Sequence, residues 1–186
     1  MKQKDTVAFN ALERLKEGNK IYISSAKCVG DVSPEKRHTT SKNGQHPYAV
    51  VVSCADSRVI PEAIFSAGIG DLFVIRVAGN VVGNYELGSI EYAVEHLGCK
   101  LVVVLGHTGC GAVNAALSEN HGLVKHITDE IKRAIGDETN AEKASVLNVR
   151  QSVSKIDESV SVDGLLVVGA LYHTESGIVD FLSTDK

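Results

Sequence analysis

Two uninterrupted apolar runs constrain the fold of this chain more than any other feature. One covers residues 48–53, with the sequence Tyr-Ala-Val-Val-Val-Ser, and the other covers residues 101–106, with the sequence Leu-Val-Val-Val-Leu-Gly. A strand with one face in water alternates apolar and polar residues, so a continuous run rich in valine predicts a strand that is buried on both faces. Strands of this kind are typical of a mainly parallel sheet covered by helices on both sides.

The rest of the chain supports an α/β fold with a mainly parallel sheet flanked by helices. Two further strands are expected at about residues 71–77 and 164–171. Helical segments are expected between the strands, at 61–66, 87–97, 111–118, 123–135 and 141–156. A last short run, 177–182, follows the fourth strand too closely for a parallel crossover, so we expect it to pair antiparallel at an edge. The simplest strand order is 2-1-3-4-5, in which the order reverses between the first and third strands.

The segment before the sheet is expected to form an N-terminal helical arm within residues 1–25. Between residues 5 and 23 the apolar residues recur at helical spacing, as Leu12 and Leu15 do. Residues 26–46 are polar and contain glycine and proline, so they are expected to be a connecting loop. The arm can therefore either fold back on its own sheet or reach a second subunit.

The length and charge of the chain limit its organisation and its partners. With 186 residues it is expected to form a single domain, 1–186. The net charge of −4 and the lack of a long basic run argue against nucleic acid as a partner. No apolar stretch approaches the ~20 residues that span a bilayer, and the N-terminus does not look like a signal peptide, so we expect no membrane association and a cytoplasmic location. The four cysteines are then expected to be thiols or metal ligands rather than disulfides.

Two cysteines and one histidine stand directly after the two apolar runs. Cys54 follows the first run, whereas His107 and Cys110 follow the second. The carboxyl ends of parallel strands share one edge of a sheet, so neighbouring strands bring together residues that are about fifty positions apart in the sequence. Two thiols and an imidazole prefer zinc, and three protein ligands leave one position open, as in catalytic zinc sites. Each residue taken alone is more often a buried thiol or a core histidine, but the combination predicts one Zn²⁺ per chain.

Asp56 and Arg58 accompany the first cysteine in the sequence Cys-Ala-Asp-Ser-Arg. An aspartate beside a zinc site is either a fourth ligand, which closes the site, or a hydrogen-bond acceptor that orients the nucleophile. A guanidinium group can hold such a carboxylate in bidentate geometry, which a lysine cannot reproduce. The alternative interpretation is an ordinary surface ion pair. We expect the two residues to act together as a catalytic pair.

The sequence resembles the β-class carbonic anhydrases, and in particular their plant-type members, in both motifs and in the segments between them. The motifs are Cys54-Ala-Asp-Ser-Arg58 and His107-Thr-Gly-Cys110, and segments 70–80, 86–94 and 165–172 also look like those of the family. This resemblance implies reversible hydration of carbon dioxide to bicarbonate and a proton by zinc-bound hydroxide, with the aspartate of the first motif accepting the hydrogen bond of the hydroxide. It also implies a homodimer or higher homo-oligomer whose N-terminal helices embrace the partner.

Five residues are expected to contact the substrate. By resemblance, Gln45, Phe73 and Tyr92 match the glutamine and the aromatic residues of the family's pocket, and the alternatives are a solvent-facing glutamine and core aromatics. Ala78 stands where plant-type members have a larger aliphatic residue, which implies a wider slot for carbon dioxide. Gly111 begins the helix after the second motif, where its amide can face bicarbonate, although a simple turn glycine looks the same.

Two other functions stay open. A carbon disulfide or carbonyl sulfide hydrolase on the same scaffold suits the same slot, because these molecules are isoelectronic with carbon dioxide. The third interpretation is a non-catalytic zinc-binding homologue, but a purely structural zinc does not require Asp56 and Arg58. Cys28 and Cys99 have no ligand-like neighbours and are expected to be ordinary small side chains.

Overall fold

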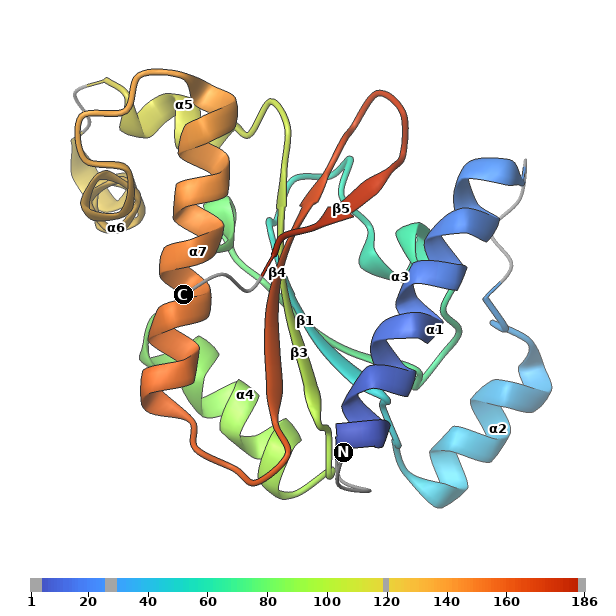
Figure 1. Cartoon of the computed structure of the whole chain (residues 1–186). Helices are drawn as coiled ribbons and strands as arrows, with labels where there is room; N and C mark the ends of the chain where they lie inside the picture. Colours follow the sequence, from blue (N-terminus) through green and yellow to red (C-terminus); the bar gives the residue numbers. More distant parts are fainter. Residues whose placement is uncertain (1–4, 26–29, 119–120, 184–186) are drawn as a thin grey trace.

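The computed structural model describes residues 5–25, 30–118 and 121–183 and has a five-stranded sheet at its centre (Figure 1). The strands are β1 (Ala49–Ser53), β2 (Leu72–Arg76), β3 (Leu101–His107), β4 (Leu166–Tyr172) and β5 (Val179–Phe181). Their order is β2-β1-β3-β4-β5, and all neighbours pair in parallel except β4 and β5, which are antiparallel. The expected α/β fold, strand order and antiparallel edge strand are confirmed.

β1 and β3 are neighbouring interior strands of the sheet, and every residue in both strands is buried. They are aligned in parallel, with Val52 beside Val104. The chain therefore leaves both strands at the same edge, with Cys54 directly after β1 and His107 as the last residue of β3. The strand order reverses here, since β2 lies on one side of the pair and β4 on the other. This carboxyl edge is where two strand ends can form a site.

Helices cover both faces of the sheet, as Figure 1 shows. They are, in chain order, α1 (Asp5–Ser24), α2 (Pro34–Asn43), α3 (Pro61–Ile64), α4 (Asn84–Glu95), α5 (Gly111–Ala116), α6 (Lys125–Ile135) and α7 (Ala141–Ser159), with the 3₁₀ turns η1 (Ala78–Asn80) and η2 (Gly122–Val124). Val51 and Val103 share a core cluster with residues of α1 and α3, whereas Val52 and Val104 share one with residues of α4 and α7. Residues of α5, α6 and α7 form a third cluster at the carboxyl edge. None of the helices in the described ranges is long and apolar enough to cross a membrane.

The helix α1 packs on the sheet of its own chain. Leu15 is completely buried, and the side chain of Asn19 donates a hydrogen bond to the carbonyl oxygen of Ile64. Gly18 approaches the end of α3 so closely that a Cβ atom there would stand 2.0 Å from the carbonyl oxygen of Phe65. The sequence left open whether this segment folds back on its own sheet or reaches a second subunit, and in the structure it folds back. The apolar stripe that predicts α1 is thus buried within the chain.

The expectation of a loop over residues 26–46 is wrong for its later part, where α2 forms. Pro34 occupies the first helical turn, and the hydroxyl of Ser33 caps the helix by accepting a hydrogen bond from the N–H group of Lys36 at 3.1 Å. No residue of α2 is buried, so the helix has no apolar periodicity that a sequence pattern can detect. Cys28 lies outside the described residues.

Replacing Leu15 by alanine is expected to lower the free energy of unfolding by about 2–5 kcal/mol, because the change leaves a cavity between α1 and the sheet. Urea unfolding followed by circular dichroism measures the loss. Val7→Ala on the same helix is the control, since Val7 is 57% exposed and its truncation removes little buried area. Equal stabilities of the two variants would contradict the packing of α1 on its own sheet.

Candidate metal centre

The structure brings Cys54, His107 and Cys110 together at the carboxyl edge of the sheet. Cys54 follows β1, His107 ends β3, and Cys110 is the N-cap residue of α5. Their ligand atoms, two sulfurs and one imidazole nitrogen, all lie within 4.8 Å of one another. The three residues are buried, with at most 4% of their surface exposed. One ion can therefore contact all three donors in a position that is shielded from bulk water.

The hydrogen bonds of His107 leave one ring nitrogen available to a metal. Nδ1 lies 3.0 Å from the carbonyl oxygen of Thr108, which can only accept, so Nδ1 carries the proton. Nε2 then has a lone pair, and in the described part of the chain this buried atom has no hydrogen-bond partner. A buried acceptor without a partner is costly, and a metal ion satisfies it. A backbone carbonyl that fixes the tautomer of the imidazole is typical of metal-binding histidines.

The two thiols lie in surroundings that favour one negative charge before any ion binds. Hydrogen bonding between them lowers the pKa of Cys54, and the same bond together with burial raises the pKa of Cys110. Sγ of Cys54 also accepts the backbone N–H groups of Asp56 and Gly79, at 3.4 and 3.2 Å. The pair therefore retains one proton, which a cation at this position displaces. Two thiolates and one imidazole match the soft donor set of Zn²⁺, so these residues fit the expected metal.

Arg58 holds the Asp56 carboxylate beside the three candidate ligands. Its Nε donates to Oδ1 at 3.0 Å and a terminal nitrogen donates to Oδ2 at 2.7 Å, which is bidentate geometry. Oδ2 lies 3.9 Å from Nε2 of His107. The hydrogen bonds from Arg58 lower the pKa of Asp56 well below its usual range. The carboxylate is thus ionised at neutral pH and stands next to the metal position while it is engaged by Arg58.

Three residues that the sequence interpretation does not assign complete the site. Arg76 at the end of β2 donates to the carbonyl oxygens of Cys54 and Asp56, at 3.2 and 2.7 Å, and so fixes the loop after β1. Gly79 supplies an N–H group to a thiol, and Thr108 supplies the carbonyl group that holds the imidazole. These contacts go to backbone atoms, or come from them, so local sequence patterns do not reveal them. The only signal is the position of the arginine at the end of a strand.

The five residues expected to bind substrate fall into two groups. Ala78 begins η1 and Gly111 begins α5, so both lie at the carboxyl edge next to the candidate ligands. Gln45 precedes β1, and Phe73 is the second residue of β2, so both lie toward the amino ends of the parallel strands, which form the amino edge of the sheet. Tyr92 on α4 packs against Phe73, with ring centroids 6.2 Å apart. Within one chain the structure does not bring the second group to the ligands.

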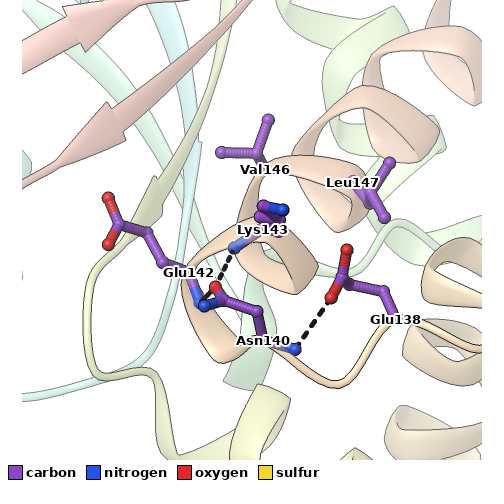
Figure 2. Close-up of a pocket in the computed structure, with 6 residues that line it drawn as sticks. All are labelled: Glu138, Asn140, Glu142, Lys143, Val146 and Leu147. Carbon is purple, nitrogen blue, oxygen red and sulfur yellow. Dashed lines mark hydrogen bonds between the residues drawn. The ribbon is translucent and has the colours of Figure 1, made fainter.

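A separate hollow at the start of α7 contains none of the residues of the metal centre. Figure 2 shows the residues that line it: Glu138, Asn140, Glu142, Lys143, Val146 and Leu147. The side chain of Asn140 accepts the N–H groups of Glu142 and Lys143, and the carboxylate of Glu138 accepts the N–H group of Asn140. These contacts cap the amino end of α7, which accounts for the polar residues here without a second site.

The family model described as carbonic anhydrase matches residues 49–179, the part of the chain that holds β1 to β4 and all three candidate ligands. The chain belongs to the carbonic anhydrase family. Carbonic anhydrase 2 of Mycobacterium tuberculosis is 37% identical over 90% of this chain and 89% of its own length. The carbonic anhydrase of Mycolicibacterium smegmatis is 35% identical over 93% of this chain and 92% of its own length.

Solved structures place the fold among the β-carbonic anhydrases. The β-carbonic anhydrase CafA of Aspergillus fumigatus superimposes with a TM-score of 0.72 at 29% identity, covering 82% of this chain and 83% of that one. A tetrameric β-carbonic anhydrase from Sordaria macrospora gives a TM-score of 0.70 at 27% identity, covering 80% of this chain and 88% of that one. The resemblance carried by the two sequence motifs is therefore confirmed.

Replacing Arg58 by methionine is expected to raise the pKa of the Asp56 carboxyl toward its ordinary value, because both side-chain hydrogen bonds are lost. Titration of the zinc-free protein followed by ¹³C NMR of the carboxyl groups measures the change. Arg37→Met is the control, since Arg37 donates to the backbone carbonyl of Val32 instead. An Asp56 pKa that stays low in Arg58→Met would show that another group holds it down.

Proposed function

We propose that this chain is a zinc-dependent carbonic anhydrase, which converts carbon dioxide and water to bicarbonate and a proton, and back. The observation that carries the proposal is the buried cluster of Cys54, His107 and Cys110 beside a carboxylate that an arginine holds. A structural zinc uses four protein ligands, whereas this cluster offers three and leaves the fourth position open. Membership in the carbonic anhydrase family supports the same reaction.

The three ligands would hold the ion and determine the net charge of the ion together with its ligands. A Zn²⁺ ion bound there supplies Lewis acidity, which lowers the pKa of a water molecule toward neutral pH. As thiolates, Cys54 and Cys110 balance the two positive charges of the ion, and Thr108 keeps His107 in the tautomer that leaves Nε2 available. We further propose a cytoplasmic location, because thiol ligands persist in a reducing compartment.

Asp56 would orient the water that attacks carbon dioxide. The depressed pKa of its carboxyl keeps it ionised at neutral pH, so it can only accept hydrogen bonds. Oδ2 lies 3.9 Å from Nε2 of His107, within reach of a water molecule at the metal position. By accepting the hydrogen bond of that water, the carboxylate would direct the oxygen lone pair toward the carbon atom. Arg58 already holds both carboxylate oxygens, so it would keep the carboxylate from binding the ion and closing the site.

Ala78 and Gly111 are proposed to contact the substrate from the same chain as the ligands. The small side chain of Ala78 leaves room for an apolar slot, which suits carbon dioxide because the molecule has no strong hydrogen-bonding group. Gly111 is the first residue of α5, so its backbone N–H group is not used within the helix and can face bicarbonate. The slot would thus bind the gas, and the N–H group would bind the anion.

We further propose a homodimer, or a larger assembly of dimers, in which Gln45, Phe73 and Tyr92 serve the metal centre of the partner. These residues lie toward the amino edge of the sheet: Gln45 precedes β1, Phe73 is on the edge strand β2, and Tyr92 packs against Phe73. A two-fold axis beside β2 would put the same surface of both subunits in contact, so that each reaches the other's centre. The tetrameric state named for the enzyme from Sordaria macrospora supports an oligomer.

The purified protein is expected to contain about one zinc per chain and to hydrate carbon dioxide. Cys110→Ala should lose both the metal and the activity, because two remaining ligands hold the ion too weakly. Metal analysis and a stopped-flow hydration assay measure the two quantities. Cys99→Ala is the matched control, since Cys99 is an equally buried thiol that donates to the carbonyl oxygen of Pro47.

Full zinc content and a full rate in Cys110→Ala would refute the ligand set. The same assay with carbonyl sulfide and carbon disulfide tests the alternative hydrolase activity. A parent protein that binds zinc but does not hydrate carbon dioxide would identify a non-catalytic member of the family.

If each site uses residues of both subunits, two differently impaired variants should restore activity in a mixed dimer. Cys110→Ala removes the metal from its own chain, and Gln45→Ala removes an amide that we propose reaches the other chain. Mixed dimers then contain one intact site, and random pairing should give about one quarter of the parent rate. Stopped-flow assays of co-refolded mixtures measure the gain.

The control for this experiment is a mixture of Cys110→Ala with His107→Ala, in which both chains lack a metal ligand. This mixture should stay inactive. A mixture of Cys110→Ala and Gln45→Ala that is no faster than the average of the two separate proteins would contradict a shared site.

A further inference from the structure

Two polar side chains on the buried face of α7 contact the η1 turn. Asn148 is 2% exposed and Ser152 is 4% exposed. Nδ2 of Asn148 donates to the carbonyl oxygen of Gly79 at 2.7 Å, and Oγ of Ser152 donates to that of Asn80 at 3.2 Å. The two donors are one helical turn apart, so they lie on the same face of the helix and hold consecutive carbonyl groups. Polar groups this deeply buried need partners, and both partners here belong to one three-residue turn.

The backbone of η1 has a conformation that needs support from its surroundings. Gly79 and Asn80 both have positive φ angles, 69° and 47°. The left-handed region is unfavourable for most residues with a side chain, and asparagine is one of the few that adopt it as single residues in turns. At Gly79 a Cβ atom would lie 2.8 Å from Cδ1 of Ile131, which shows how tightly the turn packs against α6. Hydrogen bonds from Asn148 and Ser152 stabilise this conformation.

The turn points one backbone N–H group at a candidate metal ligand. The N–H group of Gly79 donates to Sγ of Cys54 at 3.2 Å. A donor of this kind withdraws electron density from a thiolate and makes it less basic. The direction of the N–H group depends on the backbone angles of Gly79, and Asn148 holds the carbonyl group of this same residue.

We propose that Asn148 is a positioning residue for the metal centre, which holds the Gly79 carbonyl so that the Gly79 N–H group points at Cys54. Through this hydrogen bond, Asn148 influences the electron density on the Cys54 sulfur and the affinity of the site for the metal. The inference deepens the zinc-dependent function proposed above and rests on it. A leucine has nearly the shape of asparagine without its donor, and a serine has a donor that is too short to reach the turn.

The first measurement compares the zinc affinities of Asn148→Leu and Asn148→Ser with that of the parent protein. Competition with a chromophoric chelator gives the affinities, under conditions in which urea unfolding shows that the zinc-free proteins are folded. Both variants are expected to bind zinc about 10- to 100-fold more weakly, the usual effect of removing a group that supports a metal ligand.

Ser145→Ala is the matched control on the same helix. Ser145 is 3% exposed, but its hydroxyl donates to the carbonyl oxygen of Ala141 within α7 rather than to η1. Its removal should therefore leave the zinc affinity at the value of the parent protein.

A second measurement distinguishes positioning from a merely structural role. In protein loaded with Co²⁺, the thiolate-to-cobalt charge-transfer band should move to longer wavelength in both Asn148 variants. The reason is that a thiolate without its N–H donor gives up an electron more easily. A general loss of fold stability does not move this band.

Weaker zinc binding together with the shifted band supports the proposal. Folded variants whose affinity stays within about two-fold of the parent value, or whose band does not move, overturn it, and so does an equal effect of Ser145→Ala. Where Asn148→Leu fails to fold, Asn148→Ser decides the matter. A parent protein that binds neither zinc nor cobalt refutes the zinc-dependent function instead, so the two failures are distinguishable.

Discussion

The parallel pairing of β1 with β3 is the constraint on which the metal centre depends. Its register sets Ser53 beside Leu105, so Cys54 follows one strand close to the point where the other reaches His107. A shift of the register by two residues would move Cys54 by about 7 Å relative to His107, too far for one ion to contact both. The packing of individual side chains of both strands against helices on each face holds this register.

The candidate ligands are buried away from water, so their polar atoms need hydrogen bonds from the protein, and the surrounding backbone supplies them. Sγ of Cys54 receives N–H groups, including that of Gly79, while the ring N–H group of His107 meets the carbonyl oxygen of Thr108. Thr108 is in turn tied to the segment between β4 and β5, since its hydroxyl oxygen accepts the N–H group of Thr174 at 3.1 Å. Cys54 and His107 are therefore each oriented by a turn, and the turn beside His107 is held in place by another part of the fold.

The sheet and the clustering of the three candidate ligands were predictable from the sequence because strong local patterns carry them. Continuous apolar runs identify β1 and β3, and parallel strands bring their carboxyl ends together. α2 was not predictable from periodicity, since none of its residues is buried and its only signals are a capping serine and a proline. The contact between Gly79 and Asn148 was not predictable either. These residues are 69 positions apart, and their contact exists only after α7 has packed beside η1.

The length of β1 explains why the proposed active unit contains two chains. The strand has five residues, and with a rise of about 3.3 Å per residue its two ends are roughly 15 Å apart. Gln45 and Phe73 lie toward one end and the candidate ligands lie at the other, so these side chains cannot reach the metal position of their own chain. In a two-fold symmetric pair the strands of the two subunits can run in opposite directions, which sets the amino edge of one sheet against the carboxyl edge of the other. A site assembled in this way exists only in the dimer, and its activity then depends on the protein concentration.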